Sequence, residues 1–367
     1  MANHEYPTDQ IVDLTKEFIR IPSVTGEKEP IKEILDRTIA ELKDFSYERF
    51  VGPKNGSESL LFFNTPTRPG EFRVILNGHL DVVSAKPSLF DPYISDGKLF
   101  GRGSSDMKSG MAVEILVFKK NAKSLPYPIG LQIVTDEEVG GADGAKFQIE
   151  KGVRSKLVLS GEPTDLDINN EMKGVLVLNV TAIGKSAHAS ALQKGDNAVV
   201  KLSEFITKAV QAFPIPRRGE WVTTLNVGNC SSENPHNKVP DIATSTFDIR
   251  HIPEDTKDNL KNIINQLASE GIIIREDVEG AGIPCSVDPT KPDLVLLANC
   301  IELVTKKPAN FVKKAYSSDI RHFVEVGSTA ANFGPSGEDF HEDGEYGVIE
   351  SYQQYAEILS DFLKKIK

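Results

Sequence analysis

The sequence predicts an α/β protein with a mostly parallel sheet and a second, inserted domain of the split βαββαβ type. Between residues 72 and 159, apolar runs too short for buried helices alternate with helical stretches, which is typical of a largely parallel sheet. The pattern changes near Lys173, and the two prolines of VDPTKPD mark a return to the first domain. At 367 residues the chain exceeds the size at which one core usually stops growing, so two domains are expected.

The first predicted domain takes in residues 1–172 and 289–367. Its opening helices are expected from near Thr8 and over residues 27–42, where apolar side chains recur at helical spacing. The alternating region supplies expected strands at 72–76, 129–134 and 157–159 and expected helices at 111–118 and 142–149. A helix from Asp293, a strand before Gly334 and a final helix that carries Tyr352 and Phe362 complete this domain.

The second predicted domain covers residues 173–288. GVLVLNVTAIG predicts a strand, and apolar residues at helical spacing predict a helix over 197–213. Two strands, at 223–227 and 243–252, precede a helix around Leu260 and a last strand, IIIREDVE. The order βαββαβ is that of a ferredoxin-like unit, which packs independently in about a hundred residues.

Charge and composition narrow the class of protein. The net charge of −11 and the isoelectric point near 5.3 argue against nucleic acid or an anionic membrane as a partner. No run approaches the ~18 apolar residues of a membrane span, and MANHEYPTDQ lacks a basic-then-apolar signal. Three cysteines without CxxC spacing leave an odd thiol, which suits a reducing compartment. A cytoplasmic protein is therefore expected.

Histidine, aspartate and glutamate residues stand in short turns, several of them directly after the expected strands. In parallel sheets chemistry collects at the carboxyl ends of the strands. Two imidazoles and several carboxylates are the ligand set that two zinc-like ions need. The residues are His79 and Asp81 in NGHLDVV, Asp106 in GRGSSDMKSG, Glu137 and Glu138 in TDEEVGG, Glu162 in SGEPTD, and His341 in EDFHEDGEYG.

Spacing suggests roles for two of these pairs. Positions i and i+2 of an extended segment share a face, so the Asp81 side chain is expected to hydrogen-bond the His79 ring. Glu137 and Glu138 are adjacent, so one can bind metal while the other transfers protons. Each motif alone also fits a surface pair, a solvated face or a capping histidine. GRGSSD lacks the lysine and glycines of phosphate-binding loops, and no GxSxG elbow is present.

Taken in order, the motifs resemble a known family. GHLDVV, GRGSSDMKSG, DEEVGG, GEPTD, GKSAHAS and the late histidine match the di-zinc amidohydrolases and exopeptidases that include succinyl-diaminopimelate desuccinylase, acetylornithine deacetylase, aminoacylase and glutamate carboxypeptidase. The resemblance covers nearly the whole chain. It implies a zinc-peptidase-like catalytic domain and an inserted lid domain that also forms a homodimer.

The resemblance also implies roles for individual residues. His79 and Glu162 would hold one ion, Glu138 and His341 the other, and Asp106 would bridge them. Zn²⁺ is the first expectation, with Co²⁺ or Mn²⁺ as alternatives. Glu137 would be the general base that activates a bridging water and then protonates the leaving amine. Asp81 would orient His79, and the Asp106–Met107 peptide bond would be cis.

The lid residues and the substrate follow from the same resemblance. His188 would polarise the scissile carbonyl, from its own subunit or across the dimer, while Asn237, Arg250 and Ser318 would bind substrate. Arg250 has a simpler alternative, a surface pair with Asp248. The expected substrate is a small N-acyl amino acid that carries a carboxylate, and the expected enzyme is a deacylase of the desuccinylase or acetylornithine deacetylase kind.

Two alternatives to this function stay open. SSDIRHF resembles the TSDxRF segment of desuccinylases, but Ala315 and Tyr316 replace the Gly-Gly that precedes it there, and Phe90 stands where tryptophan is common. A dipeptidase or carboxypeptidase of the same family is the first alternative. The second is a catalytically silent, metal-binding scaffold protein.

Overall fold

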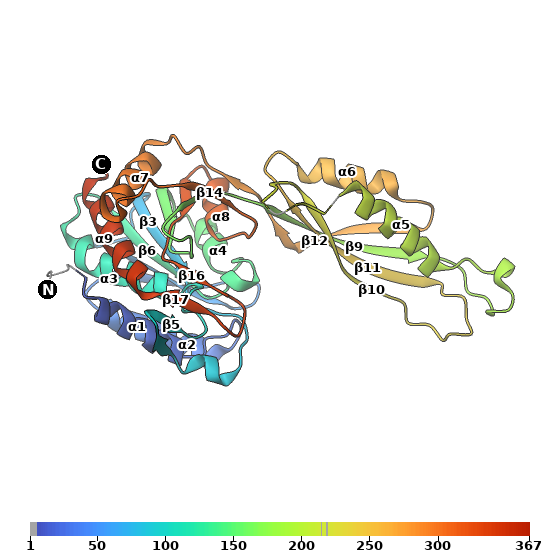
Figure 1. Cartoon of the computed structure of the whole chain (residues 1–367), viewed down its shortest axis with the longest axis horizontal. Helices are drawn as coiled ribbons and strands as arrows, with labels where there is room; N and C mark the ends of the chain where they lie inside the picture. Colours follow the sequence, from blue (N-terminus) through green and yellow to red (C-terminus); the bar gives the residue numbers. More distant parts are fainter. Residues whose placement is uncertain (1–5, 214, 218) are drawn as a thin grey trace. The chain divides into compact units, whose positions relative to one another are not determined.

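The computed structural model describes residues 6–213, 215–217 and 219–367, and it divides into two compact units (Figure 1). The larger unit takes in Met1–Glu171, Val287–Lys313 and Ser318–Lys367, and the smaller takes in Met172–Ser286 and Lys314–Ser317. The short second segment of the small unit falls within the part of the sequence assigned above to the first domain. Residues 1–5, which begin the segment inspected for a signal, lie outside the described residues.

The larger unit is built on a mixed sheet whose central strands are parallel. The sheet runs in the order β1-β2-β6-β3-β7-β15-β8, and β6, β3, β7 and β15 pair in parallel. The antiparallel hairpin of β1 and β2 forms one edge and was not expected from the sequence. The strands are β1 (Ser46–Val51), β2 (Glu58–Phe63), β3 (Phe72–His79), β6 (Ile129–Val134), β7 (Ser155–Ser160), β8 (Ile168–Met172), β14 (Phe311–Lys314), which pairs with β8, and β15 (Thr329–Asn332).

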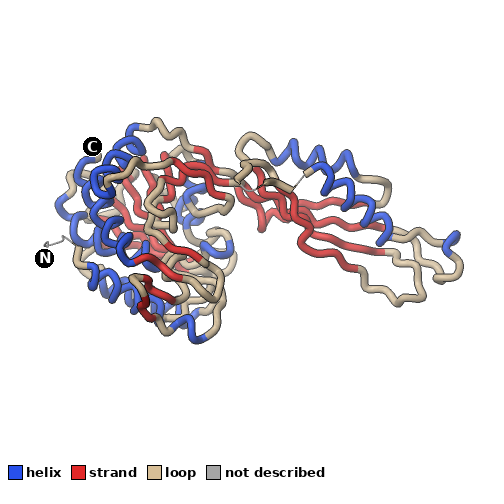
Figure 2. Tube along the Cα trace, viewed as in Figure 1, coloured by secondary structure: helices blue, strands red, loops and turns tan. Residues whose placement is uncertain are grey.

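Helices cover this sheet, as Figure 2 shows by colour. The helices α1, α3, α7 and α9 pack on one another, and α4 and α8 form a second contacting pair. In Figure 1, β3 and β6 lie between these two groups. The α/β class with a mainly parallel sheet is therefore confirmed. The helices are α1 (Thr8–Arg20), α2 (Lys28–Glu41), α3 (Lys108–Asn121), α4 (Ala145–Glu150), α7 (Pro292–Thr305), α8 (Ile320–Glu325) and α9 (Ile349–Lys365).

A small second sheet in the larger unit joins segments that are far apart in the sequence. It runs in the order β16-β17-β5-β4, and each pair is antiparallel. Tyr346 on β17 faces Phe100 on β5 in register. This pairing brings the polar turn of His341 beside the glycine-rich loop that follows β5. The strands are β4 (Tyr93–Ser95), β5 (Lys98–Phe100), β16 (Gly337–Glu338) and β17 (Tyr346–Val348).

The small unit has the βαββαβ order that the sequence predicts. Its antiparallel sheet runs β10-β11-β9-β12, the strand order of a ferredoxin-like unit. The helices α5 and α6 contact each other, and Phe205 of α5 stacks on Phe247 of β11 in the core. Its elements are β9 (Gly174–Ile183), α5 (Ala198–Ala212), β10 (Thr224–Ser231), β11 (Ile242–His251), α6 (Lys257–Leu267) and β12 (Ile272–Gly282), followed by the two-residue strand β13 (Cys285–Ser286).

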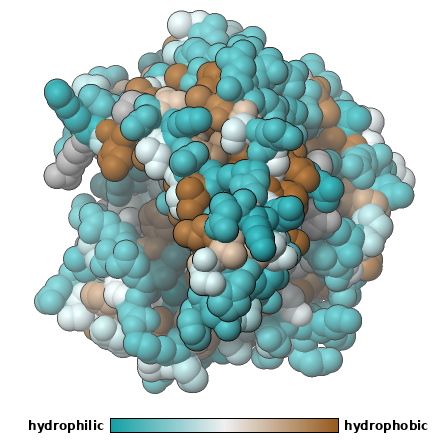
Figure 3. Space-filling view, turned by 90° about the vertical axis from the view of Figure 1, so that its right-hand side faces the viewer, coloured by the Kyte–Doolittle hydropathy of each residue, from teal (hydrophilic) through white to brown (hydrophobic). Residues whose placement is uncertain are grey.

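One face of the surface can be described by its hydropathy. The face in Figure 3 is mostly hydrophilic, and its hydrophobic residues stand in small, scattered groups. Across the described ranges 6–213, 215–217 and 219–367, no helix is both long and apolar enough to span a bilayer.

Candidate metal centre

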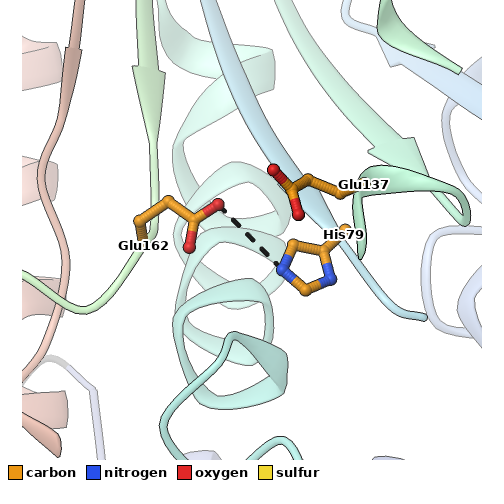
Figure 4. Close-up of side chains that lie close together, drawn as sticks. All are labelled: His79, Glu137 and Glu162. Atoms are coloured by element: carbon orange, nitrogen blue, oxygen red, sulfur yellow. Dashed lines mark ion pairs between the residues drawn. The ribbon is translucent and has the colours of Figure 1, made fainter. Parts of the chain in front are cut away.

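Three neighbouring parallel strands bring His79, Glu137 and Glu162 together. His79 is the last residue of β3, Glu137 follows β6 in a short 3-10 turn, and Glu162 follows β7. Because β6, β3 and β7 are adjacent and parallel, their carboxyl ends meet at one edge of the sheet. One ligand atom of each residue lies within 4.8 Å of the others. Figure 4 shows both carboxylates beside the His79 ring.

Asp106 lies between two histidines. Its Oδ1 atom is 2.9 Å from Nε2 of His79, and its Oδ2 atom is 3.4 Å from Nε2 of His341. The same His341 nitrogen lies 2.9 Å from Oε2 of Glu138, while His79 Nε2 lies 4.0 Å from Oε1 of Glu162. The five residues expected to bind metal therefore form one continuous cluster, with the Asp106 carboxylate at its centre.

The backbone around Asp106 is unusually tight. The Asp106–Met107 peptide bond is cis, as the family resemblance implied, and α3 begins at the next residue. Gly110 in the first turn of α3 lies against the loop that carries Glu162, and a Cβ atom there would come within 2.1 Å of the Gly161 carbonyl oxygen. Only glycine allows this close approach of two segments that both supply ligands.

The orientation of His79 differs in detail from the expectation. Its Nδ1 atom is 2.9 Å from the main-chain carbonyl oxygen of Asp81 and 3.5 Å from the Asp81 carboxylate. The carbonyl is therefore the closer acceptor for the ring N–H. The buried Asp81 carboxylate accepts a 2.8 Å hydrogen bond from the Thr25 hydroxyl and longer, 3.4 Å bonds from the N–H groups of Glu137 and Glu138. Asp81 thus ties the turn after β6 to the end of β3.

The electrostatics of the cluster suit cations. Burial raises the pKa values of Glu137 and Glu162 well above the ordinary glutamate value. Burial also opposes ionisation of Asp106, but hydrogen bonds with His341 and His79 outweigh it and hold the Asp106 pKa below its usual range. The hydrogen bonds that the His341 ring donates to the carboxylates of Asp106 and Glu138 raise the pKa of His341 to about 10. Without a cation, protons balance these carboxylates, so the donor set fits divalent ions in their place.

Further residues hold the turn that carries Glu137 and Glu138, and they were not singled out in the sequence. Asp136 Oδ2 accepts hydrogen bonds from the N–H groups of Asp143 (2.7 Å) and Gly144 (3.1 Å). Arg321 donates 2.6 Å and 3.0 Å hydrogen bonds to the carbonyl oxygens of Gly140 and Ser318. Asp136 lies in the TDEEVGG motif and Arg321 in the SSDIRHF segment, so these motifs were the signal that could have identified them.

The small unit carries three of the residues expected to act on substrate. The backbone of His188 pairs with that of Lys238, and the N–H of Ala189 donates to the Asn237 carbonyl oxygen at 3.0 Å. His188 and Asn237 are therefore close neighbours. The His188 side chain is exposed, and its Nδ1 atom is 2.8 Å from the Ser190 hydroxyl.

Arg250 and Ser318 are both engaged with side chains of their own units. Arg250 donates two hydrogen bonds to the carboxylate of Asp248, at 2.8 Å and 3.0 Å, so the surface pair considered above is present. Ser318 is buried, and its hydroxyl donates to Oδ1 of Asn332 at 2.8 Å. Contact of either residue with substrate stays a prediction.

Residues 75–365 match the model of peptidase family M20/M25/M40. The chain belongs to this family. Family membership makes it an enzyme that hydrolyses amide bonds and that uses divalent metal ions, for which the cluster around Asp106 is the candidate site. The resemblance inferred from the sequence motifs is therefore confirmed.

Individual members of the M20 family extend the comparison. The chain is 28% identical to succinyl-diaminopimelate desuccinylase of Corynebacterium glutamicum, over 97% of this chain and 96% of that protein. A probable carboxypeptidase of Talaromyces marneffei is 26% identical over 73% of this chain and 65% of that longer protein. The solved structure of aminopeptidase PepT from Bacillus cereus shares the fold, with a TM-score of 0.80, 18% identity, and coverage of 98% of this chain and 99% of that one.

Proposed function

We propose that this M20 enzyme removes the acyl group of an N-acyl amino acid at a pair of divalent metal ions. The observation that carries the proposal is the position of Asp106, whose two carboxylate oxygens face His79 and His341 separately. A carboxylate placed in this way can be shared by two ions. Zn²⁺ is the first candidate, and Co²⁺ and Mn²⁺ are alternatives with similar nitrogen and oxygen ligands.

The ligand atoms divide into two sets around Asp106. His79 and Glu162 would hold one ion, and Glu138 and His341 would hold the other. The contacts of 4.0 Å and 2.9 Å within these pairs support the division. When bound, the ions would polarise the amide carbonyl and lower the pKa of water.

Glu137 would act as the general base. Its carboxylate lies beside His79 and Glu162 without belonging to either proposed ligand pair (Figure 4). Burial raises its pKa, and a carboxylate that holds protons more tightly than usual can accept a proton from water near neutral pH. The hydroxide that remains would attack the amide carbonyl carbon. Glu137 would then deliver the proton to the amide nitrogen as the C–N bond breaks, which releases the acyl group as a carboxylate and the amine. Asp81 would support it by binding its N–H group.

Residues of the small unit would bind and orient the substrate. His188 would donate a hydrogen bond to the developing oxyanion. Arg250 would clamp the carboxylate of the substrate, because its planar guanidinium already forms such a two-bond pair with Asp248. Asn237 and Ser318 would add further polar contacts. The small unit would also form the dimer, and an odd number of cysteines without CxxC spacing supports a reducing, cytoplasmic location.

The substrate class is tested with a panel of amides. The desuccinylase relative, which matches almost the whole chain, supports an N-succinyl amino acid as the first candidate. The probable carboxypeptidase relative supports a peptidase as the alternative. N-succinyl amino acids, N-acetyl amino acids and dipeptides should be incubated with enzyme supplied with Zn²⁺ or Co²⁺. Preferred cleavage of dipeptides would replace the deacylase proposal, and no cleavage of any N-acyl amino acid in the panel would contradict it.

A further inference from the structure

Glu345 lies in the same polar turn as His341 but belongs to none of the roles described so far. Its carboxylate is buried inside the larger unit, and it is surrounded by the loop that leads to Asp106. The Oε1 atom accepts hydrogen bonds from three main-chain N–H groups, those of Gly103 (2.9 Å), Ser105 (3.0 Å) and Asp106 (3.1 Å). The glycine-rich loop therefore curls around one carboxylate oxygen.

The second oxygen of Glu345 completes the anchor. Oε2 accepts a 2.5 Å hydrogen bond from Arg102, which is also buried. The main chain adds a bond from the N–H of Gly101 to the Glu345 carbonyl, and β17 continues from there in register with β5. Both oxygens and the backbone of this single residue thus bind residues 101–106.

The other end of the turn needs such an anchor. His341 has φ of +67°, in the left-handed region that few non-glycine residues adopt. Its side chain is about half exposed, so packing alone does not hold it in place. The buried end of the turn at Glu345 is four residues away, and Arg102 also donates a 3.4 Å hydrogen bond to the carbonyl oxygen of Glu342.

We propose that Glu345 is a positioning residue that sets the spacing between Asp106 and His341. It binds the N–H of Asp106 directly and is joined to His341 through a short turn, so it fixes both partners of the 3.4 Å contact. Outer residues that orient metal ligands typically change metal affinity by about 10–100-fold when they are mutated. This inference rests on the metal ligands assigned under the proposed function.

The test compares metal binding with stability in matched variants. Glu345→Gln keeps the shape but places an amide where three N–H groups or Arg102 need an acceptor. Glu345→Asp keeps the negative charge but shortens the side chain by one methylene, which moves the carboxylate away from the loop. This variant replaces Glu345→Gln in the test if Glu345→Gln does not fold. Asp293→Asn is the control, because Asp293 is also a carboxylate paired with an arginine. It accepts two hydrogen bonds from Arg73, which lies near the end of β3 opposite His79.

The measurements are made on the whole chain. Calorimetry gives the number and affinity of Zn²⁺ ions, the visible spectrum of the Co²⁺ form reports coordination, and the Tm of the metal-free protein reports stability. We expect the Glu345 variants to bind at least one Zn²⁺ ion about 10–100-fold more weakly than the wild type. We also expect them to have an altered visible spectrum in the Co²⁺ form. Asp293→Asn should lower the metal-free Tm and leave both metal readouts unchanged.

Two results would overturn the inference. Folded Glu345 variants with wild-type affinity and spectrum would make the residue purely structural, while the proposed function would stand. A wild-type protein that binds no divalent ion would remove both proposals together.

Discussion

The Nε2 atom of His79 lies 2.9 Å from Oδ1 of Asp106, while the other oxygen of Asp106 faces His341 at 3.4 Å. These two histidines come from opposite ends of the sequence, one from a sheet strand and one from an irregular turn. The contacts place a single carboxylate between a buried imidazole and a half-exposed one, within a cluster of acidic side chains. Such an arrangement is costly unless cations or protons balance the carboxylates.

Replacing Glu137 should abolish turnover but keep the metal, whereas replacing Glu138 should lose the metal. Glu137→Gln should lower kcat by about 10²–10⁴-fold and leave metal content nearly intact, because it removes a proton acceptor and no ligand. Glu138→Gln should lose metal, because Glu138 contacts His341 at 2.9 Å. Metal content measured by mass spectrometry beside kcat decides the assignment. If Glu137→Gln loses metal and Glu138→Gln keeps it, the two roles are reversed.

Metal binding should release protons and strengthen with pH. The pKa of His341 is raised to about 10 by Asp106 and Glu138, so the ring is protonated at pH 7 in the metal-free protein. A metal ion must displace that proton, and the apparent affinity should therefore rise with pH, by about tenfold per unit for each proton released, until the pH passes the raised pKa. Calorimetry in buffers of different ionisation enthalpy measures the release. His341→Gln should reduce it by about one proton, and an unchanged release would exclude His341 as a ligand.

His188 should act across a dimer. Oligomers of this kind usually pair through identical surfaces, and the small unit is the proposed interface. Mixing His188→Ala subunits with Glu137→Ala subunits should restore partial activity, because each mixed dimer retains one complete site. Subunit exchange must be verified, for example with two tags of different mass. Verified exchange without recovery would mean that His188 acts within its own chain or has no part in catalysis.

Arg250 should recognise a carboxylate of the substrate. Arg250→Ala should lower kcat/KM by about 10²-fold, which corresponds to roughly 2–3 kcal/mol for a lost charged hydrogen bond. Arg250→Lys should also impair turnover, because it keeps the charge but loses the two-bond geometry. Asp248→Asn, which removes only the present partner, is the matched control and should have a smaller effect. The wild-type enzyme should prefer an acyl amino acid over its methyl ester, and equal kcat/KM values would leave Arg250 as a surface residue.

The sequence predicted those parts of the fold that have strong local patterns. Ile129–Val134 is the observed β6, and helical spacing located the start of α1 and both ends of α5 to within one residue. The hairpin of β1 and β2 was missed because its pairing depends on contacts with β6 across the sheet, which no local period records. The short strands β5 and β17 were missed for the same reason, since each is only three residues long.

The sequence predicted the metal ligands of the candidate site but not the contacts that orient them. The metal ligands could be named because their residue types and order carry chemistry that repeats within the M20 family. The acceptor for the His79 ring could not, because the spacing of His79 and Asp81 does not distinguish the Asp81 carbonyl from its carboxylate. Glu345 could not be found either, because Glu342 and Asp343 in the same turn are exposed acidic residues and only the folded loop shows that Glu345 is buried.

Titration of the metal-free enzyme with Zn²⁺ tests the central claim most directly. Chelated enzyme should be mixed with increasing Zn²⁺ while bound metal and hydrolysis of the best amide from the panel are measured together. Two bound ions per chain, with activity that rises from background and reaches its maximum as the second ion binds, is the predicted result. Full activity in the chelated enzyme, or an active enzyme that binds no divalent ion at the cluster around Asp106, would contradict the account.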